Sequence, residues 1–166
     1  MKNILPLPFS TYLLFFILVS CDTNPCDGIN CDNGVCDTVT GTCLCIGGYE
    51  QDTSGICTVQ WTTKMAGNYA VSDSCTGSNP GTINYSVNVT SISPKTIDFS
   101  TLGTLGKPIM GAHNSSTAFV IDTTFSNGTI LTGSGLLINT TFVLNYIVND
   151  TIGGSIDTCM ATFTRL

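Results

Sequence analysis

Apolar and polar residues alternate with a period of two over most of the chain after residue 57. The clearest stretch is 83–90, in which the odd positions from Ile83 to Val89 are apolar and the even positions are polar. A period of two separates side chains onto opposite faces of a β-strand, whereas a helix repeats every three to four residues. The pattern therefore predicts an all-β region, with further strands over 69–75, 96–102, 116–125, 129–139, 141–149 and 155–165.

Turn-forming residues separate these predicted strands. Asn127-Gly128 between two strand patterns is the sharpest signal, because this pair tolerates the positive φ angles of a tight hairpin. Short connections between about seven strands predict an antiparallel meander, closed into a small β-barrel or, as the alternative, folded as a β-sandwich. Closure would pair the first strand with the last and cover both sheet edges.

Two cysteines fall on the outermost predicted strands of this region. Cys75 lies on the first and Cys159 on the last, so we predict a disulfide between them, which favours the closed barrel. A bond across so long a segment would stabilise the fold by about 4–5 kcal/mol in the chain-entropy description.

Gly67-Asn68-Tyr69 opens the first predicted strand. This opening and the up-and-down strand order resemble lipocalin-like (calycin) barrels, although those barrels usually carry Trp where this chain has Tyr69. The resemblance implies an interior that either is filled by side chains or holds a small apolar ligand. The side chains that we expect to line such a site are Ile121, Phe125, Leu136, Ile138, Val143 and Ile147.

The N-terminus reads as a targeting segment. The unbroken apolar run over 12–19 is too short for a bilayer span, which needs about 20 residues, and suits the core of a signal peptide over 1–20. The run ends in Leu18-Val19-Ser20-Cys21, which resembles a bacterial lipobox. That resemblance implies lipid attachment to Cys21 and a short tether over 21–25. The alternative is a eukaryotic secretory signal, with Cys21 unpaired.

Six cysteines crowd into residues 26–57, a segment too short to bury a core of its own. Such segments are held by disulfides or by a metal. Zinc is disfavoured because the pair Cys43-Leu44-Cys45 is not C-x-x-C and the segment has no histidine. Spacing alone leaves 15 possible pairings of six cysteines open.

Asn33-Gly34, the Cys43-x-Cys45 pair and Gly47-Gly48-Tyr49 resemble an EGF-like module. The resemblance implies the disulfides Cys26–Cys36, Cys31–Cys43 and Cys45–Cys57. Pro25 stands where calcium-binding members carry an acidic residue, so calcium is not favoured, and the receptor-agonist pattern around the last cysteine is absent. We therefore expect 26–57 to act as a spacer for the domain over 58–166. With four disulfides, Cys21 is the one cysteine of nine that is left for the lipid.

The chain has a formal net charge of −6 and no cluster of basic residues. This balance argues against nucleic acid as a partner. The partners that we expect are the membrane, through the lipid anchor, and an unknown protein, glycan or small apolar ligand. The predicted location is the bacterial cell envelope, with the outer membrane as the anchoring membrane.

Candidate catalytic residues are sparse. His113 is the only histidine, and a catalytic triad would have to combine it with Ser115 or Ser116 and with Asp98 or Asp122. No Gly-x-Ser-x-Gly frame surrounds a serine, so we expect His113 to be a turn or surface residue. The aspartates of the β domain fall mostly at predicted strand ends or turns. We predict a non-enzymatic protein with no cofactor, no catalytic residue and no metal site.

Overall fold

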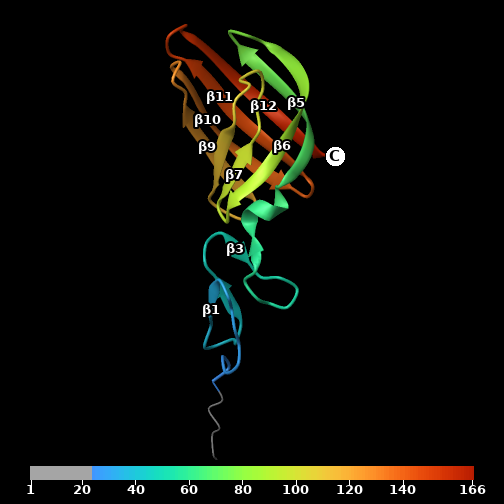
Figure 1. Ribbon diagram of the computed structural model, residues 1–166, viewed down its shortest axis with the longest axis vertical. Coiled ribbons are helices and arrows are strands. Elements are labelled where there is room, and N and C mark those ends of the chain that lie inside the picture. The colour runs from blue at the N-terminus through green and yellow to red at the C-terminus, as the bar shows by residue number, and fades with distance from the viewer. Residues whose placement is uncertain (1–23) are drawn as a thin grey trace, which may run out of the picture.

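The computed structural model describes residues 24–166, and the predicted signal peptide and Cys21 lie outside this range. The described chain is mostly β-structure: a small disulfide-linked module followed by a closed antiparallel barrel (Figure 1). The predicted all-β class and the barrel are confirmed, and the alternative of a sandwich is not. None of the helices in residues 24–166 has the length and apolarity that crossing a membrane requires.

The disulfide module, residues 26–57, contains little core other than its own cystines. Strand β1 (Gly34–Cys36) pairs with β2 (Cys43–Cys45), and β3 (Tyr49–Glu50) pairs with β4 (Val59–Gln60). Because β4 follows the last cysteine, the small sheet extends beyond the predicted boundary at residue 57. The disulfides are Cys26–Cys36, Cys31–Cys43 and Cys45–Cys57, the pairing that the sequence resemblance implied.

Eight strands form the barrel, each paired with its neighbours in the chain. Strand β12 also pairs with β5, from Arg165 opposite Tyr69 to Asp157 opposite Gly77, and this pairing closes the sheet. The predicted disulfide Cys75–Cys159 joins two directly opposed residues of that pair. The strands are β5 (Gly67–Gly77), β6 (Gly81–Ser93), β7 (Thr96–Phe99), β8 (Ile109–His113), β9 (Ala118–Thr124), β10 (Thr129–Ile138), β11 (Thr141–Asp150) and β12 (Ser155–Arg165).

Strand β8 has no counterpart among the predicted strands. It is five residues long and carries Gly111 at its central inward position, so the apolar alternation that marks a strand is broken there. A Cβ at Gly111 would lie 3.0 Å from the ring of Phe119, which means that the neighbouring strand supplies the missing apolar bulk. Strand β7 is shorter than predicted, because the chain leaves the sheet after Phe99 and Leu102 turns into the barrel interior.

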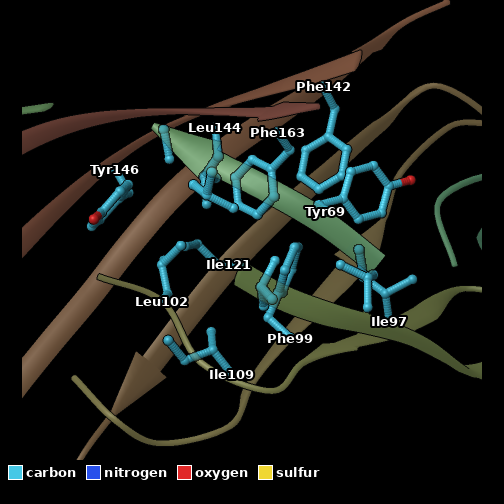
Figure 2. Close-up of a cluster of buried hydrophobic side chains, with 14 of the residues drawn as sticks. Tyr69, Ile97, Phe99, Leu102, Ile109, Ile121, Phe142, Leu144, Tyr146 and Phe163 are labelled. Atoms are coloured by element: carbon cyan, nitrogen blue, oxygen red, sulfur yellow. The ribbon is translucent and has the colours of Figure 1, made fainter. Parts of the chain in front are cut away.

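Five aromatic side chains fill the barrel interior at the end near the module. Phe142 and Phe163 stack with ring centroids 4.0 Å apart, and Tyr69 meets Phe142 edge-on at 5.0 Å. Phe99 and Phe119 complete the cluster at 5.5 Å from each other. Figure 2 shows four of these rings packed together, with Tyr146 set apart from them.

Gly135 on β10 leaves the space that one of these rings occupies. It lies directly opposite Phe119, and a Cβ at Gly135 would fall 2.1 Å from the ring. We expect Gly135→Ala to lower the free energy of unfolding by about 1–3 kcal/mol, because the ring must leave its packed position. Chemical denaturation measures the loss. Ser134→Ala, at the exposed neighbouring position, is the control and should change stability by less than about 0.5 kcal/mol.

A short 3-10 helix, η1 (Trp61–Lys64), joins the module to one end of the barrel. The Trp61 backbone N–H donates to Gly48 O at 2.9 Å, and its indole N–H donates to Tyr49 O at 3.0 Å. On the barrel side, the Thr62 hydroxyl donates to Ser93 O at 2.9 Å. The module therefore packs against this proximal end, and the distal end of the barrel points away from it (Figure 1).

Candidate functional site

A cavity of about 480 Å³ opens at the distal end of the barrel. Its walls come from the ends of β5, β6, β10, β11 and β12 and from the 102–105 segment that follows β7. The cavity exists because the inward side chains become smaller toward this end. On β12 the inward positions run from Phe163 through Ala161 to Cys159, and on β5 they run from Tyr69 to Cys75.

Asp73 forms the polar floor of this cavity. It lies at an inward position of β5, and only 1% of its surface is exposed. Its Oδ2 accepts hydrogen bonds from the Tyr146 hydroxyl at 2.5 Å and from the Tyr85 hydroxyl at 3.1 Å. Its Oδ1 is buried and has no hydrogen-bond partner within residues 24–166.

The expectation that the aspartates of the β domain lie mostly at strand ends and turns is wrong for Asp73. Its odd-numbered position matches those of Tyr69 and Val71, which are both buried. The Asp73 side chain therefore lies on the core face of β5. A carboxylate at a core position of an alternating strand is the sequence signal that marks this site.

The two tyrosines are held as hydrogen-bond donors. Burial, and secondarily the hydrogen bond and charge of Asp73, raise the pKa of Tyr146 far above its ordinary value. Burial likewise raises the pKa of Tyr85, although the Gly103 N–H, which donates to its oxygen at 2.9 Å, opposes the shift. Both hydroxyls therefore remain protonated at physiological pH and donate to Asp73.

Gly103 allows the 102–105 segment to approach this group closely. Its φ is +54°, in the left-handed region that favours glycine. A Cβ there would lie 3.2 Å from the Tyr146 hydroxyl and 3.3 Å from Asp73 Oδ2. Gly103 therefore places a backbone N–H, and no side chain, beside the Tyr85 hydroxyl and Asp73.

Two further carboxylates lie at the mouth of the cavity. Asp157 accepts hydrogen bonds from the Asn79 backbone N–H at 2.7 Å and from its side-chain amide at 3.0 Å, and these bonds lower the pKa of Asp157. Asp150 lies beside the turn between β11 and β12. Among the described residues that line the cavity there is no Lys, Arg or His, so both its floor and its mouth are acidic.

Asp73, Cys75 and Cys159 bring their polar atoms within 4.8 Å of one another, a spacing that could suit a metal ion. The two sulfurs are joined in a disulfide, however, and offer no thiolate. One carboxylate oxygen is left, and hard cations such as Ca²⁺ take six to eight oxygen ligands. The group does not fit a metal centre.

None of the six predicted lining residues borders the cavity. Leu136, Ile138 and Ile147 are 49%, 54% and 43% exposed and lie on the outer face of β10 and β11, as does half-buried Val143. The prediction of an inward orientation is wrong for these four. Side chains alternate between the two faces of a strand, so an assignment that is shifted by one residue places every side chain on the opposite face. Ile121 is part of the filled core, and Phe125 is half-buried against it.

His113 is not the turn or surface residue that the sequence indicated. It ends β8 with 5% of its surface exposed, and its Nδ1 lies 3.1 Å from Ser115 O. Nε2 is buried without a hydrogen-bond partner in the described chain. The ring packs 5.8 Å from Phe119 in the filled part of the barrel, and it does not line the cavity.

Burial lowers the pKa of the His113 imidazole below its ordinary value of 6.5, although its contact with Ser115 O opposes the shift. Below pH 6.5 the unfolded chain therefore binds more protons than the folded chain. We expect the free energy of unfolding to fall as the pH drops below 6.5, down to the folded-state pKa. Urea denaturation between pH 7.5 and 5 measures this dependence. His113→Gln should flatten it, since the chain has one histidine, and an unchanged slope in that variant would contradict the assignment.

No known protein family and no curated protein matches the sequence. Solved structures with a related fold include EF1p2_mFAP2b bound to DFHBI, which is 18% identical, with a TM-score of 0.51 over 64% of this chain and 98% of that one. The redesigned β-barrel mFAP1, bound to DFHBI, is 18% identical, with a TM-score of 0.48 over 64% of this chain and all of that one. A Bacteroides ovatus protein of unknown function is 17% identical, with a TM-score of 0.44 over 59% of this chain and 40% of that one. At 18% identity, the similarity to the first of these structures concerns the barrel fold alone.

Proposed function

We propose that this chain is a non-enzymatic lipoprotein of the bacterial cell envelope that binds a small ligand in the distal cavity of its barrel. The observation that carries the proposal is Asp73 on the cavity floor, whose Oδ1 has no hydrogen-bond partner among residues 24–166. A buried polar oxygen without a donor is costly, and a ligand that donates a hydrogen bond removes that cost. The cavity volume of about 480 Å³ lies within the usual range of small-molecule sites, about 300–1,000 Å³.

The cysteines support the proposed anchor. Eight of the nine pair with one another in four disulfides, and Cys21 at the end of the lipobox-like sequence is the ninth. Four disulfides also indicate an oxidising, extracytoplasmic compartment. The EGF-like module would act as the spacer. Since it packs against the proximal end of the barrel, an anchored chain would present the cavity away from the membrane.

The cavity also bears on the alternative of a lipocalin-like carrier for an apolar molecule. Leu102, Leu105 and Val148 give its walls an apolar character that suits the body of such a ligand. The Asp73 floor, in contrast, favours a ligand with a polar end. As for an enzyme, the described lining contains aspartates but neither a histidine nor a free thiol.

Binding and anchoring can be tested on the full chain extracted from its membrane. The intact mass should correspond to a chain that begins at Cys21, carries diacylglycerol and contains four disulfides. A soluble chain without lipid would reject the anchor. Binding is tested separately by titration with the neutral dye Nile red, whose fluorescence should rise on binding.

Two tryptophan variants on one strand locate the dye. Val148→Trp fills the cavity and should abolish the fluorescence rise, whereas Val143→Trp adds the same side chain to the outer face of β11 and should leave it intact. Melting temperatures show whether both variants fold. Equal dye binding by the two variants would place it outside the cavity, and no binding by the wild type would reject the proposed ligand site for apolar molecules.

A further inference from the structure

We propose that the ligand of the distal cavity is a protonated amine with an apolar body, whose ammonium group binds Asp73 Oδ1. This inference rests on the proposed ligand-binding function and names its ligand class. Four features of the cavity lead to it: the pattern of hydrogen bonds around Asp73, the charges at the mouth, the apolar walls and the poor fit to a metal ion.

The hydrogen bonds around Asp73 leave one acceptor free. Tyr146 and Tyr85 both donate to Oδ2, and an ionised carboxylate accepts at both of its oxygens. Oδ1 has no donor within the described range 24–166 and remains for a donor from a ligand. A protonated amine supplies three N–H donors together with a positive charge, and hydrogen bonds between ionised groups are about twice as strong as neutral ones.

The charges at the mouth favour the same ligand class. Asp150 and Asp157 line the entrance, and the nearby Lys107 lies over the ring of Phe125, outside the lining. A cleft with charges of one sign concentrates ligands of the opposite sign. The cavity therefore attracts cations and repels anions, so a fatty acid or another carboxylate ligand is disfavoured.

The cavity walls indicate the chemistry of the part of the ligand that lies beyond the ammonium group. Ile83, Leu102, Leu105 and Val148 surround the space above Asp73, and the Cys75–Cys159 disulfide adds further apolar surface. An amine that buries a hydrocarbon or aromatic group against these side chains gains the hydrophobic contribution as well as the ion pair. A metal ion would use neither the walls nor the disulfide.

Isothermal titration of the full chain with three matched probes tests the ligand class. The probes are 4-phenylbutylamine, the neutral 4-phenylbutan-1-ol and the anionic 4-phenylbutyrate. We expect the amine to bind at least about 10-fold more tightly than the alcohol, and the carboxylate to bind most weakly. Equal affinities of amine and alcohol would overturn the amine proposal and leave the ligand-binding function intact. If none of the three binds and Nile red does not bind either, the proposed function fails as well.

Asp73→Asn keeps the shape of the side chain and removes its charge. We expect it to weaken amine binding by roughly 10- to 100-fold and to leave the alcohol nearly unaffected. Asp98→Asn on β7 makes the same change of net charge away from the cavity and should alter neither affinity by more than about twofold. An amine preference that survives in Asp73→Asn overturns the assignment.

Two further outcomes need their own measurements: an Asp73→Asn variant that does not fold, and a cavity that binds a metal ion. If Asp73→Asn does not fold, as judged by its melting temperature, the ranking of the three probes on the wild type decides the proposal. Titration with CaCl2 tests whether the cavity binds a metal ion instead. The inference would be overturned if millimolar Ca²⁺ displaced the amine and if a folded Asp73→Asn variant no longer bound Ca²⁺. No binding of Ca²⁺ supports it.

Discussion

Removing the Cys75–Cys159 disulfide should lower the free energy of unfolding of the barrel by about 4–5 kcal/mol. The bond joins the first barrel strand, β5, to the last, β12, across a sequence separation of 84 residues. In the chain-entropy description, the stabilisation grows with the length of the segment that the bond closes, because the unfolded chain loses more freedom. The double variant Cys75→Ala/Cys159→Ala avoids a leftover thiol, and urea denaturation followed by circular dichroism measures the loss.

A matched control exists within the same chain. Cys26–Cys36 closes a separation of only 10 residues in the disulfide module, at the other end of the molecule from the cavity. Cys26→Ala/Cys36→Ala should therefore leave the unfolding midpoint of the barrel nearly unchanged. If removing Cys75–Cys159 costs less than about 1 kcal/mol, the backbone ladder between β5 and β12 holds the barrel closed by itself, and the entropic argument is wrong for this protein.

Phe142→Ala should have the second large effect, a loss of about 3–5 kcal/mol in the free energy of unfolding. The ring is fully buried, stacks on Phe163 at 4.0 Å and meets Tyr69 edge-on at 5.0 Å. Alanine at this position removes the apolar contacts and leaves a hole in the filled half of the barrel, where the surrounding rings have little freedom to collapse. Chemical denaturation of the full chain measures the loss.

Ile147→Ala on the same strand is the control for this variant. Its side chain is 43% exposed on the outer face of β11, so its truncation should cost less than about 1 kcal/mol. The pair also tests the orientation of the strand. Equal losses for the two variants would mean that β11 does not present Phe142 to the interior and Ile147 to solvent.

The division of the barrel into a filled half and a hollow half determines where a ligand can enter. The aromatic cluster blocks the end near the module, and the smaller inward residues leave space at the distal end, where Asp73, Asp150 and Asp157 lie. The same taper therefore supplies both stability and a site. A variant that disturbs the aromatic cluster should reduce stability without changing the ligand preference, and Asp73→Asn should change that preference.

The sequence by itself determined the organisation of the chain. Alternation with a period of two is a local property, and it located seven of the eight barrel strands. The placement of Cys75 and Cys159 on the outermost strands indicated closure, because a disulfide requires its two strands to be neighbours. The crowded cysteines of residues 26–57 indicated a module held by disulfides, since so short a segment cannot bury a core.

The tertiary structure alone decided which faces point inward and what surrounds Asp73. On β10 and β11 both faces carry apolar residues, so local periodicity cannot distinguish the outward Leu136 and Ile147 from the inward Leu131 and Phe142. Strand register settles the question, because it places each side chain against partners from distant parts of the chain. Tyr85 and Tyr146 lie 12 and 73 residues from Asp73 in the sequence, and only closure of the barrel brings both hydroxyls to its carboxylate. The cavity has the same origin: its walls come from six separate segments, and no one of them encloses space on its own.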